Sequence, residues 1–480
     1  MKIFIKDSMN PETGAMLQAL YSRSHISVEE HLKGVNQEVS QIIEEREVSL
    51  QEKMAEFYIK YGHESIGDCG SSTVFIEGIS IIAAKAIQDT PLYRGQESST
   101  RYINFANQFE QVKNFLEQSG FTAYHENRNA IDNLLRSYLT FYEKVFKKMR
   151  EHRSSEMGVN YETSDSLTKR AINAWAFDVG RAFLPAATTT QLSFHGSLRD
   201  LRNQFMRLKT HALPELRLIS QSVLFQLMSA YPHSFKKDDW IISDEDKPQP
   251  FFVSYPSLCS YKKSFDKEIV FNGDEEFAAN YDPRKDDEFN TPNSSLAYGT
   301  LSVRSSVNSG LDYGSWRDLQ RHRNGFCAAT IPYNYCYRSD NLNIESWYMD
   351  NICQYPDLKA EWEKLEKEIL LVIGSIEGED ESHLSSYFLP LGKIVPVVIS
   401  YSLQEWDYIF NLRLRDTVHP SLVKYLSRLV LDMKDIVPYY HDKYGQKIAG
   451  ELNSHVNGKS FGTRRGEQTI ITNGKAISDD

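Results

Sequence analysis

The strongest constraint on the fold of this chain is an internal repeat. The tripeptide Phe183-Leu184-Pro185 recurs in the second half as Phe388-Leu389-Pro390. An arginine four residues before a histidine also occurs twice, in the same order and at nearly the same interval, as Arg207/His211 and Arg415/His419. On a helix this spacing places both side chains on one face. The repeat predicts two related domains rather than one large core.

The composition restricts the class of protein. A chain of 480 residues is long for one core, and its hydrophobic content of 41% is ordinary for a globular protein. The net charge of -11 should repel nucleic acid, so no nucleic-acid partner is expected. The apolar run from Lys393 to Tyr401 is too short to cross a bilayer, so no membrane partner is expected either.

The five cysteines are scattered and form no Cys-x-x-Cys pair. This pattern argues against a zinc site and against a disulfide framework, so no metal is predicted and a cytoplasmic location is expected. The alternating residues from Met1 to Lys6 are typical of a first β-strand rather than a signal peptide.

Hydrophobic spacing predicts several long helices and one further strand over residues 72–80. The helical stretches are 10–23, 37–62, 124–152, 167–184 and 197–230. Acidic residues and prolines in 232–250 mark the best domain boundary, and 273–296 is predicted to be a long loop. The predicted organisation is therefore a first domain over 1–235, a second over 250–445, and a polar tail over 451–480 that is either disordered or an arm ordered only on a partner.

Two separated segments look like halves of one motif. The first half of the chain contains Gln96-Glu97-Ser98-Ser99-Thr100-Arg101-Tyr102, and the second half contains Arg321-His322-Arg323. Together they resemble the signature of the flavin-dependent thymidylate synthases, in which Arg-His-Arg is followed after seven residues by Ser, with Asn-Glu before that Ser and Arg-Tyr after it. The residues around His63, with Glu64, Ser65 and Asp68, are similar to the flavin-contacting loop of the same family.

The resemblance implies a role for each matching residue. The residues matched to the substrate site are Glu97, Ser99, Arg101 and Arg181. The residues matched to flavin contacts are His63, Ser65, Asp68, His211, Arg321, His322, Arg323 and His419. Arg207 and Arg415 match the arginine that faces the pyrimidine ring, where a guanidinium would stabilise negative charge during the reaction.

The departures from the family pattern are complementary. The first half has Asp89-Thr90-Pro91 in place of Arg-His-Arg. The second half has Ala329, Ile331 and Tyr333 in place of Glu, Ser and Arg, and Ser386 in place of the phosphate-binding arginine. Each half therefore keeps what the other has lost, which predicts one good site built from both.

The resemblance implies an α+β fold of two tandem domains, each with a central antiparallel sheet and long helices. It also implies one-carbon transfer to C5 of a pyrimidine nucleotide, with deoxyuridylate as the default substrate. FAD would be the cofactor, and NADPH and methylenetetrahydrofolate the co-substrates. Two alternatives stay open: a related enzyme on another pyrimidine nucleotide, and an inactive nucleotide-binding or scaffold protein. Because the family works as four domains, a homodimer of this chain forming a pseudo-tetramer is expected.

Overall fold

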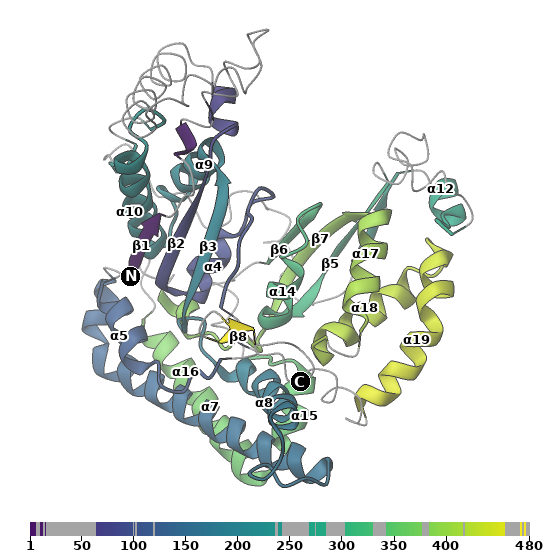
Figure 1. Cartoon of the computed structure of the whole chain (residues 1–480). Coiled ribbons are helices and arrows are strands. Elements are labelled where there is room, and N and C mark those ends of the chain that lie inside the picture. The colour runs from purple at the N-terminus through teal and green to yellow at the C-terminus, as the bar shows by residue number, and fades with distance from the viewer. Residues whose placement is uncertain are drawn as a thin grey trace. The chain divides into compact units, whose positions relative to one another are not determined.

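The computed structural model of the chain is shown in Figure 1. It describes residues 1–5, 10–12, 15, 64–98, 100, 103–118, 121–235, 239–241, 268–273, 275–284, 303–329, 342–376, 384–415, 418–456, 471–472 and 475–476. The chain divides into two compact units that alternate along the sequence. Unit 1 comprises Met1–Ser98, Glu110–His125 and Ala187–Ser254, and unit 2 comprises Ser99–Phe109, Glu126–Ala186 and Tyr255–Asp480.

Unit 1 is built on a three-stranded antiparallel sheet in the order β1-β2-β3. The strands are β1 (Lys2–Ile5), β2 (Ser71–Ser80) and β3 (Thr189–Ser197). Side chains on β2 and β3 alternate between buried and more exposed, as expected for a sheet with one covered face. The predicted strands over 1–6 and 72–80 are therefore confirmed.

Helices follow the strands of unit 1 directly. They are α4 (Ile81–Ile87), α9 (Leu198–Leu208) and α10 (Pro214–Ala230), with η2 (Glu64–Asp68), α5 (Phe109–Gln118) and α6 (Thr122–Glu126) before or between them. The hydroxyls of Ser80 and Ser197 cap α4 and α9 by accepting main-chain N–H groups. The single helical stretch predicted over 197–230 is wrong, because Pro214 begins a new helix and its ring cannot continue the preceding one.

Unit 2 has a four-stranded antiparallel sheet in the order β4-β5-β7-β6. The strands are β4 (Glu268–Asn272), β5 (Arg304–Asp312), β6 (Phe326–Ala329) and β7 (Ile394–Ser402). Two of them run into helices, α14 (Tyr313–Leu319) and α17 (Leu403–Arg413), and α18 (Pro420–Asp432) and α19 (Pro438–Val456) come next. Asp312 and Ser402 cap α14 and α17. Helices together with antiparallel sheets confirm the α+β class.

Helices from both halves of the sequence pack together in unit 2. These are α7 (Arg128–Glu156), α8 (Ser166–Gly180), α15 (Ser346–Cys353) and α16 (Pro356–Ser375). Figure 1 shows α7 alongside α16, where the Phe141 and Trp362 rings lie 5.8 Å apart and Lys144 forms a 2.7 Å ion pair with Glu361. Residues 126–186 thus belong to the same unit as the second half of the chain. The domains predicted over 1–235 and 250–445 divide the chain in sequence order, and they remain predictions.

The two Phe-Leu-Pro segments pair with each other in unit 2. Each follows a short 3-10 helix, η3 (Arg181–Phe183) or η5 (Leu384–Phe388). The Ala186 N–H donates to the Leu389 carbonyl at 2.8 Å, and the Leu391 N–H donates to the Leu184 carbonyl at 2.9 Å. The two donors, Ala186 and Leu391, are separated by the same number of residues as the two acceptors, Leu184 and Leu389. The two bonds are therefore related as in a contact with twofold symmetry. A side chain at Gly392 would collide with Ala182, since a Cβ there would lie 2.7 Å from the Ala182 Cβ.

Two further predictions differ from the structure. The predicted loop over 273–296 contains a short helix, α12 (Glu275–Asn280), which the acidic first turn of Glu275 and Glu276 stabilises. The predicted tail over 451–480 begins inside α19, which continues to Val456, and it also contains strands β8 (Ile471–Thr472) and β9 (Lys475–Ala476). The helices predicted over 10–23 and 37–62 lie almost entirely outside the described residues. Within the described part of the chain, no helix is long and apolar enough to span a membrane.

Candidate functional site

Arg181 lies at the centre of a buried charged cluster in unit 2. Its side chain is 2% exposed, and its Nη1 is 3.6 Å from Oδ2 of Asp318 on α14. Asp312, which caps α14, accepts hydrogen bonds from the Ser315 N–H at 2.8 Å and the Tyr348 hydroxyl at 3.1 Å. We call Arg181, Asp312, Asp318 and Tyr348 the Arg181 cluster. A residue from the first half of the sequence is here surrounded by residues from the second.

The charges of the Arg181 cluster only partly satisfy one another. Burial alone would lower the pKa of Arg181, but Tyr348, Asp318, Asp178 and Asp312 together raise it above its ordinary value. The Arg181 Nε and Nη2 atoms and the Asp312 Oδ1 atom are buried and have no hydrogen-bond partner among the described residues. Buried polar atoms are normally paired, so these three are exceptions to the rule.

The stability of unit 2 should depend on the ionisation of Asp312. Burial raises the pKa of this carboxyl from 3.8 to about 6, although Arg181 and the Ser315 hydrogen bonds lower it in part. Between about pH 4 and pH 6 the native state therefore binds a proton that the unfolded chain releases. The free energy of unfolding should fall by about 3 kcal/mol as the pH rises through this range.

Urea unfolding at pH 4 and pH 6.5 tests this dependence, with Asp312→Asn as the comparison. The variant should lose the part of the fall that Asp312 contributes, and the part that Glu12 contributes should remain. It separates Asp312 from Glu12, whose pKa burial raises to about 7. Equal pH slopes in the two proteins would contradict the prediction.

His419 is held inside the same region of unit 2. It is fully buried, and its Nε2–H donates to the Asp178 carbonyl at 3.1 Å, since a carbonyl can only accept. Its Nδ1 then accepts from the Ser421 hydroxyl, 2.7 Å away. Both nitrogens of this predicted flavin contact are thus engaged within the protein.

The Arg321-His322-Arg323 segment follows α14 directly. Arg321 is well exposed, with 47% of its side chain accessible, and its Nη2 lies 3.9 Å from Oδ1 of Asp318. His322 is 6% exposed, and Arg323 is half-buried. Asp318 therefore lies between Arg181 and Arg321, so the predicted phosphate-binding arginine and the Arg-His-Arg segment are brought together in unit 2.

Arg413 contacts this segment and was missed in the sequence. Its Nε donates to His322 Nε2 at 3.0 Å, and its Nη2 donates to the Asp318 carbonyl at 3.1 Å. Arg415, which the Arg-to-His spacing indicates, is exposed, lies two residues beyond the end of α17 and donates to the Asn411 carbonyl of that helix at 3.1 Å. Aligning the helix starts at Ser197 and Ser402 places Arg207 opposite Leu412, one residue before Arg413 and three before Arg415, so the sequence offered a partial signal for Arg413.

Unit 1 holds the predicted substrate residue Glu97 in a second buried ion pair. Lys85 on α4 lies 2.6 Å from Glu97, and both side chains are at most 3% exposed. Gln88 bridges them, accepting from Lys85 at 3.0 Å and donating to Glu97 at 2.9 Å. Neither Lys85 nor Gln88 was singled out in the sequence, although Lys85 is a lysine within an apolar helix.

The remaining predicted residues of unit 1 lie at its surface or beyond the described residues. Arg207 is exposed, and its Nη2 donates to the Asp89 carbonyl at 2.9 Å. His211 is half-buried and accepts the Leu213 N–H at 3.1 Å, and Asp68 forms an ion pair with Arg199. His63, like Ser99, Arg101, Ile331 and Tyr333, lies outside the described residues, and so does the side chain of Ser65.

Units 1 and 2 carry the same strand-to-helix junction with the carboxylate on opposite sides. In unit 1, Glu215 on α10 accepts from the N–H and hydroxyl of the cap residue Ser80, at 2.8 and 2.6 Å. In unit 2 the cap residue is Asp312, and α18 contributes Ser421, whose hydroxyl lies 2.7 Å from that of Ser315. Each junction has one buried carboxylate and one serine, which agrees with a repeated domain.

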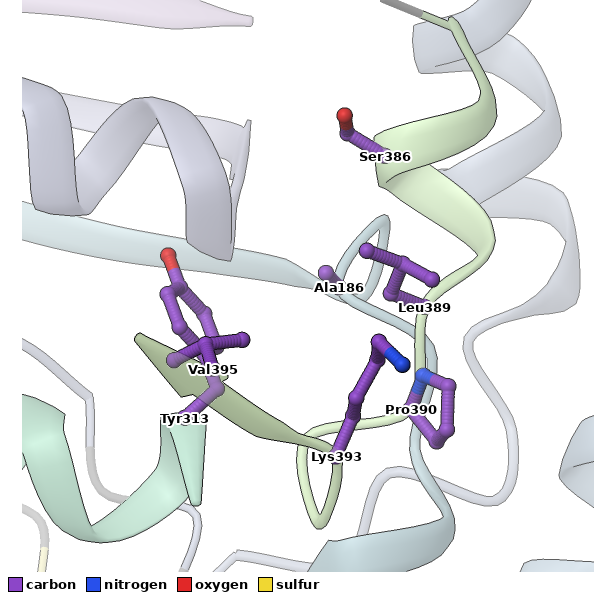
Figure 2. Close-up of a pocket in the computed structure, with 7 residues that line it drawn as sticks. All are labelled: Ala186, Tyr313, Ser386, Leu389, Pro390, Lys393 and Val395. Atoms are coloured by element: carbon purple, nitrogen blue, oxygen red, sulfur yellow. The ribbon is translucent and has the colours of Figure 1, made fainter. Parts of the chain in front are cut away.

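A small cavity lies around Ser386, the position where the second half lacks a phosphate-binding arginine. Figure 2 shows it lined by Tyr313 from α14, Lys393 and Val395 near β7, and the Leu389-Pro390 segment. It measures about 10 Å³, which is close to the limit for one water. Lys393 Nζ donates to the Leu342 carbonyl at 2.9 Å, so its charge is directed into the protein. This cavity is too small for a nucleotide.

Among the described residues, no group of three or more His, Cys, Asp or Glu side chains could hold a metal ion. The charged site residues of unit 2 lie in the Arg181 cluster and in the Arg-His-Arg segment. Such residues can bind an anionic group through their arginines, which lie beside buried carboxylates.

Comparison with known proteins finds several relatives that are named UPF0159 proteins. A UPF0159 protein of Chlamydia muridarum is 27% identical over 258 residues, which cover 48% of this chain and 45% of that protein. A UPF0159 protein of Chlamydia pneumoniae is 26% identical over 229 residues, covering 45% and 40%. One of Thermoplasma acidophilum is 21% identical over 448 residues, covering 81% and 88%. The chain thus spans less than half the length of the two chlamydial relatives.

A family model matches residues in the first half of the chain. Residues 7–233 match the model described as thymidylate synthase complementing protein. These residues include β2, β3, α9, the Lys85–Glu97 pair and Arg181. Residues 7–233, slightly less than half of the chain, are thus similar to the thymidylate synthase complementing protein family.

Proposed function

We propose that this protein transfers a one-carbon unit to C5 of a pyrimidine nucleotide in a flavin-dependent reaction, with deoxyuridylate as the substrate and thymidylate as the product. FAD is the proposed cofactor, and NADPH and methylenetetrahydrofolate are the proposed co-substrates. The family match over residues 7–233 supports the reaction class.

One observation carries the proposal. Asp318 lies within 3.6 Å of Arg181 and within 3.9 Å of Arg321. Arg181 comes from the half that keeps the phosphate-binding residues, and Arg321 from the half that keeps Arg-His-Arg. Their meeting in one unit supports a site assembled from both halves of the chain.

The residues of unit 2 fit a flavin in part. Arg321 presents an exposed guanidinium, which suits a phosphate or the polar edge of a flavin ring. His322 and His419 are buried with their ring nitrogens engaged, so they fit a supporting role better than direct contact. When bound, the flavin supplies the hydride chemistry.

The chain's own residues would bind and orient the nucleotide. A nucleotide phosphate needs cationic donors, which Arg181 and Arg101 supply in the proposed site, with the Ser99 hydroxyl adding a donor. The two unpartnered nitrogens of Arg181 are consistent with this role. Arg207 or Arg415 would face the pyrimidine ring and stabilise negative charge on it.

The burial of Arg181 favours a second candidate, a nucleotide-binding protein without catalytic activity. Arg181 is 2% exposed, and the carboxylates of Asp318 and Asp312 are among the groups that stabilise its charge within the protein. A related enzyme that acts on another pyrimidine nucleotide is a third candidate.

Purified protein distinguishes these candidates. Absorbance of released flavin separates the enzymes from the inactive protein, and product analysis with deoxyuridylate, folate donor and reductant separates the two enzymes. In the same assay Arg101→Ala should weaken deoxyuridylate binding ten- to a hundredfold, about 1.5–3 kcal/mol, and leave flavin content unchanged. An unchanged dissociation constant would exclude Arg101 from the site.

The proposed assembly makes a separate prediction. In a homodimer that forms a pseudo-tetramer, some interfaces pair the residues around Glu97 with the Arg-His-Arg segment. The other interfaces pair the two segments that have lost these residues. About one FAD per chain is therefore expected. Light scattering gives the chain count, and flavin absorbance relative to protein concentration gives the ratio. Two flavins per chain, or a stable flavin-loaded monomer, would contradict a shared site.

A further inference from the structure

The surroundings of His322 define its protonation. Arg413 Nε, 3.0 Å from His322 Nε2, stays protonated in proteins and can only donate. His322 Nε2 must therefore accept, which leaves the ring neutral with its proton on Nδ1. That nitrogen lies 3.8 Å from Oε1 of Glu405, which precedes Arg413 by about two turns on α17.

We propose that Arg413 is a positioning residue, which holds His322 as the Nδ1–H tautomer and thereby fixes the main chain that presents Arg321. This role rests on the proposed function only in its last step, the use of Arg321 for flavin. The contacts themselves do not depend on any ligand.

The main chain around His322 is held at several points. Arg413 Nη2 donates to the Asp318 carbonyl, and the Tyr401 hydroxyl donates to the carbonyl of His322 at 3.0 Å. The segment also packs closely against β7, because a Cβ at Gly325 would lie 2.1 Å from the Tyr401 ring. The backbone is thus fixed while Arg321 remains exposed.

The arrangement is specific to unit 2. In unit 1 Arg207 makes a related contact to the Asp89 carbonyl at 2.9 Å, but Thr90 stands where His322 stands in unit 2. No imidazole is present there to receive the guanidinium. The pairing of Arg413 with a histidine is therefore retained in the half of the chain that keeps Arg-His-Arg.

The charges facing His322 act in opposite directions on its pKa. Burial lowers the pKa below its ordinary value, Glu405 raises it, Arg413 lowers it, and Asp318 raises it. Loss of Arg413 should therefore raise the pKa of His322, and loss of Glu405 should lower it. A general loosening of the fold would not move the pKa in opposite directions.

Nitrogen-15 NMR of the histidine rings in the full chain tests the proposal. Wild-type His322 should show the Nδ1–H tautomer, with a pKa that rises in Arg413→Met and falls in Glu405→Gln. Arg428→Gln, an exposed arginine on α18, is the control and should change neither. If Arg413→Met does not fold, Arg413→Lys provides the test, since it keeps the charge and one donor and should preserve the tautomer. An Nε2–H tautomer in wild type, or an unchanged pKa in Arg413→Met or a shifted tautomer in Arg413→Lys, would overturn the assignment.

FAD titration of the same variants tests the last step. Arg413→Met should bind FAD roughly tenfold more weakly, the equivalent of one hydrogen bond, and Arg428→Gln should bind like wild type. If wild type binds no FAD, the proposed function fails while the tautomer result still decides the role of Arg413 toward His322. Equal affinity in Arg413→Met and wild type would overturn the positioning of Arg321.

Discussion

Replacing Arg181 by Ala should destabilise the protein by about 3–5 kcal/mol, because the change leaves Asp312 and Asp318 buried without their cationic partner. The loss should show as a lower midpoint in urea unfolding at pH 7. It should be smaller near pH 4, where Asp312 is protonated in the native state. The removal of Arg181 also takes away an influence that lowers the pKa of Asp312.

Arg428→Ala is the matched control, since Arg428 is exposed on α18 and its loss should change stability by less than about 0.5 kcal/mol. If Arg181→Ala unfolds at the wild-type midpoint and only nucleotide affinity falls, Arg181 serves the ligand alone. A loss of both would show that one arginine supports the fold and the site together.

Removal of Lys85 or Glu97 alone should also cost about 3–5 kcal/mol, since each leaves its partner buried and unpaired. Lys85→Met combined with Glu97→Leu should recover much of this loss, because an apolar pair can replace a buried ion pair at little cost. Urea unfolding of the two single variants and the double variant gives the coupling free energy directly.

The result separates two roles for Glu97. A strong coupling to Lys85 would mean that the carboxylate stabilises unit 1. If Glu97→Leu leaves the free energy of unfolding within about 0.5 kcal/mol of wild type and changes only nucleotide affinity, the substrate role that the family resemblance implies is the main one. Gln88 bridges the pair, so Gln88→Leu should weaken it less than either single loss.

Much of the local structure could be predicted from the sequence. Alternation indicated β1 and β2, and hydrophobic spacing indicated α7 and α8 to within a few residues of their bounds. The break between α9 and α10 was missed because the hydrophobic spacing continues through it, although Pro214 marks it. Long-range packing was also missed: nothing local in residues 126–186 shows that they pack with α16 rather than with the sheet of unit 1.

The site was predictable only where a motif named the residue. Arg181 and Arg321 were identified from the family pattern, and the structure brings them to either side of Asp318. Asp312, Tyr348 and Arg413 had no such pattern. Their importance comes from burial and mutual charge, which depend on tertiary contacts that no spacing along the chain reveals. The pairing of Arg207 with Arg415 followed the histidine spacing, whereas the helix starts align Arg207 with Leu412, the neighbour of Arg413.

The paired Phe-Leu-Pro segments have an evolutionary consequence. In an assembly of identical subunits, every substitution at a symmetric contact appears on both sides at once, so neither side can specialise. On the proposed duplication, one gene encodes both sides of this contact at separate codons. Selection could then retain an arginine before one segment, at Arg181, and a serine before the other, at Ser386, while the two reciprocal bonds between the segments stayed in place.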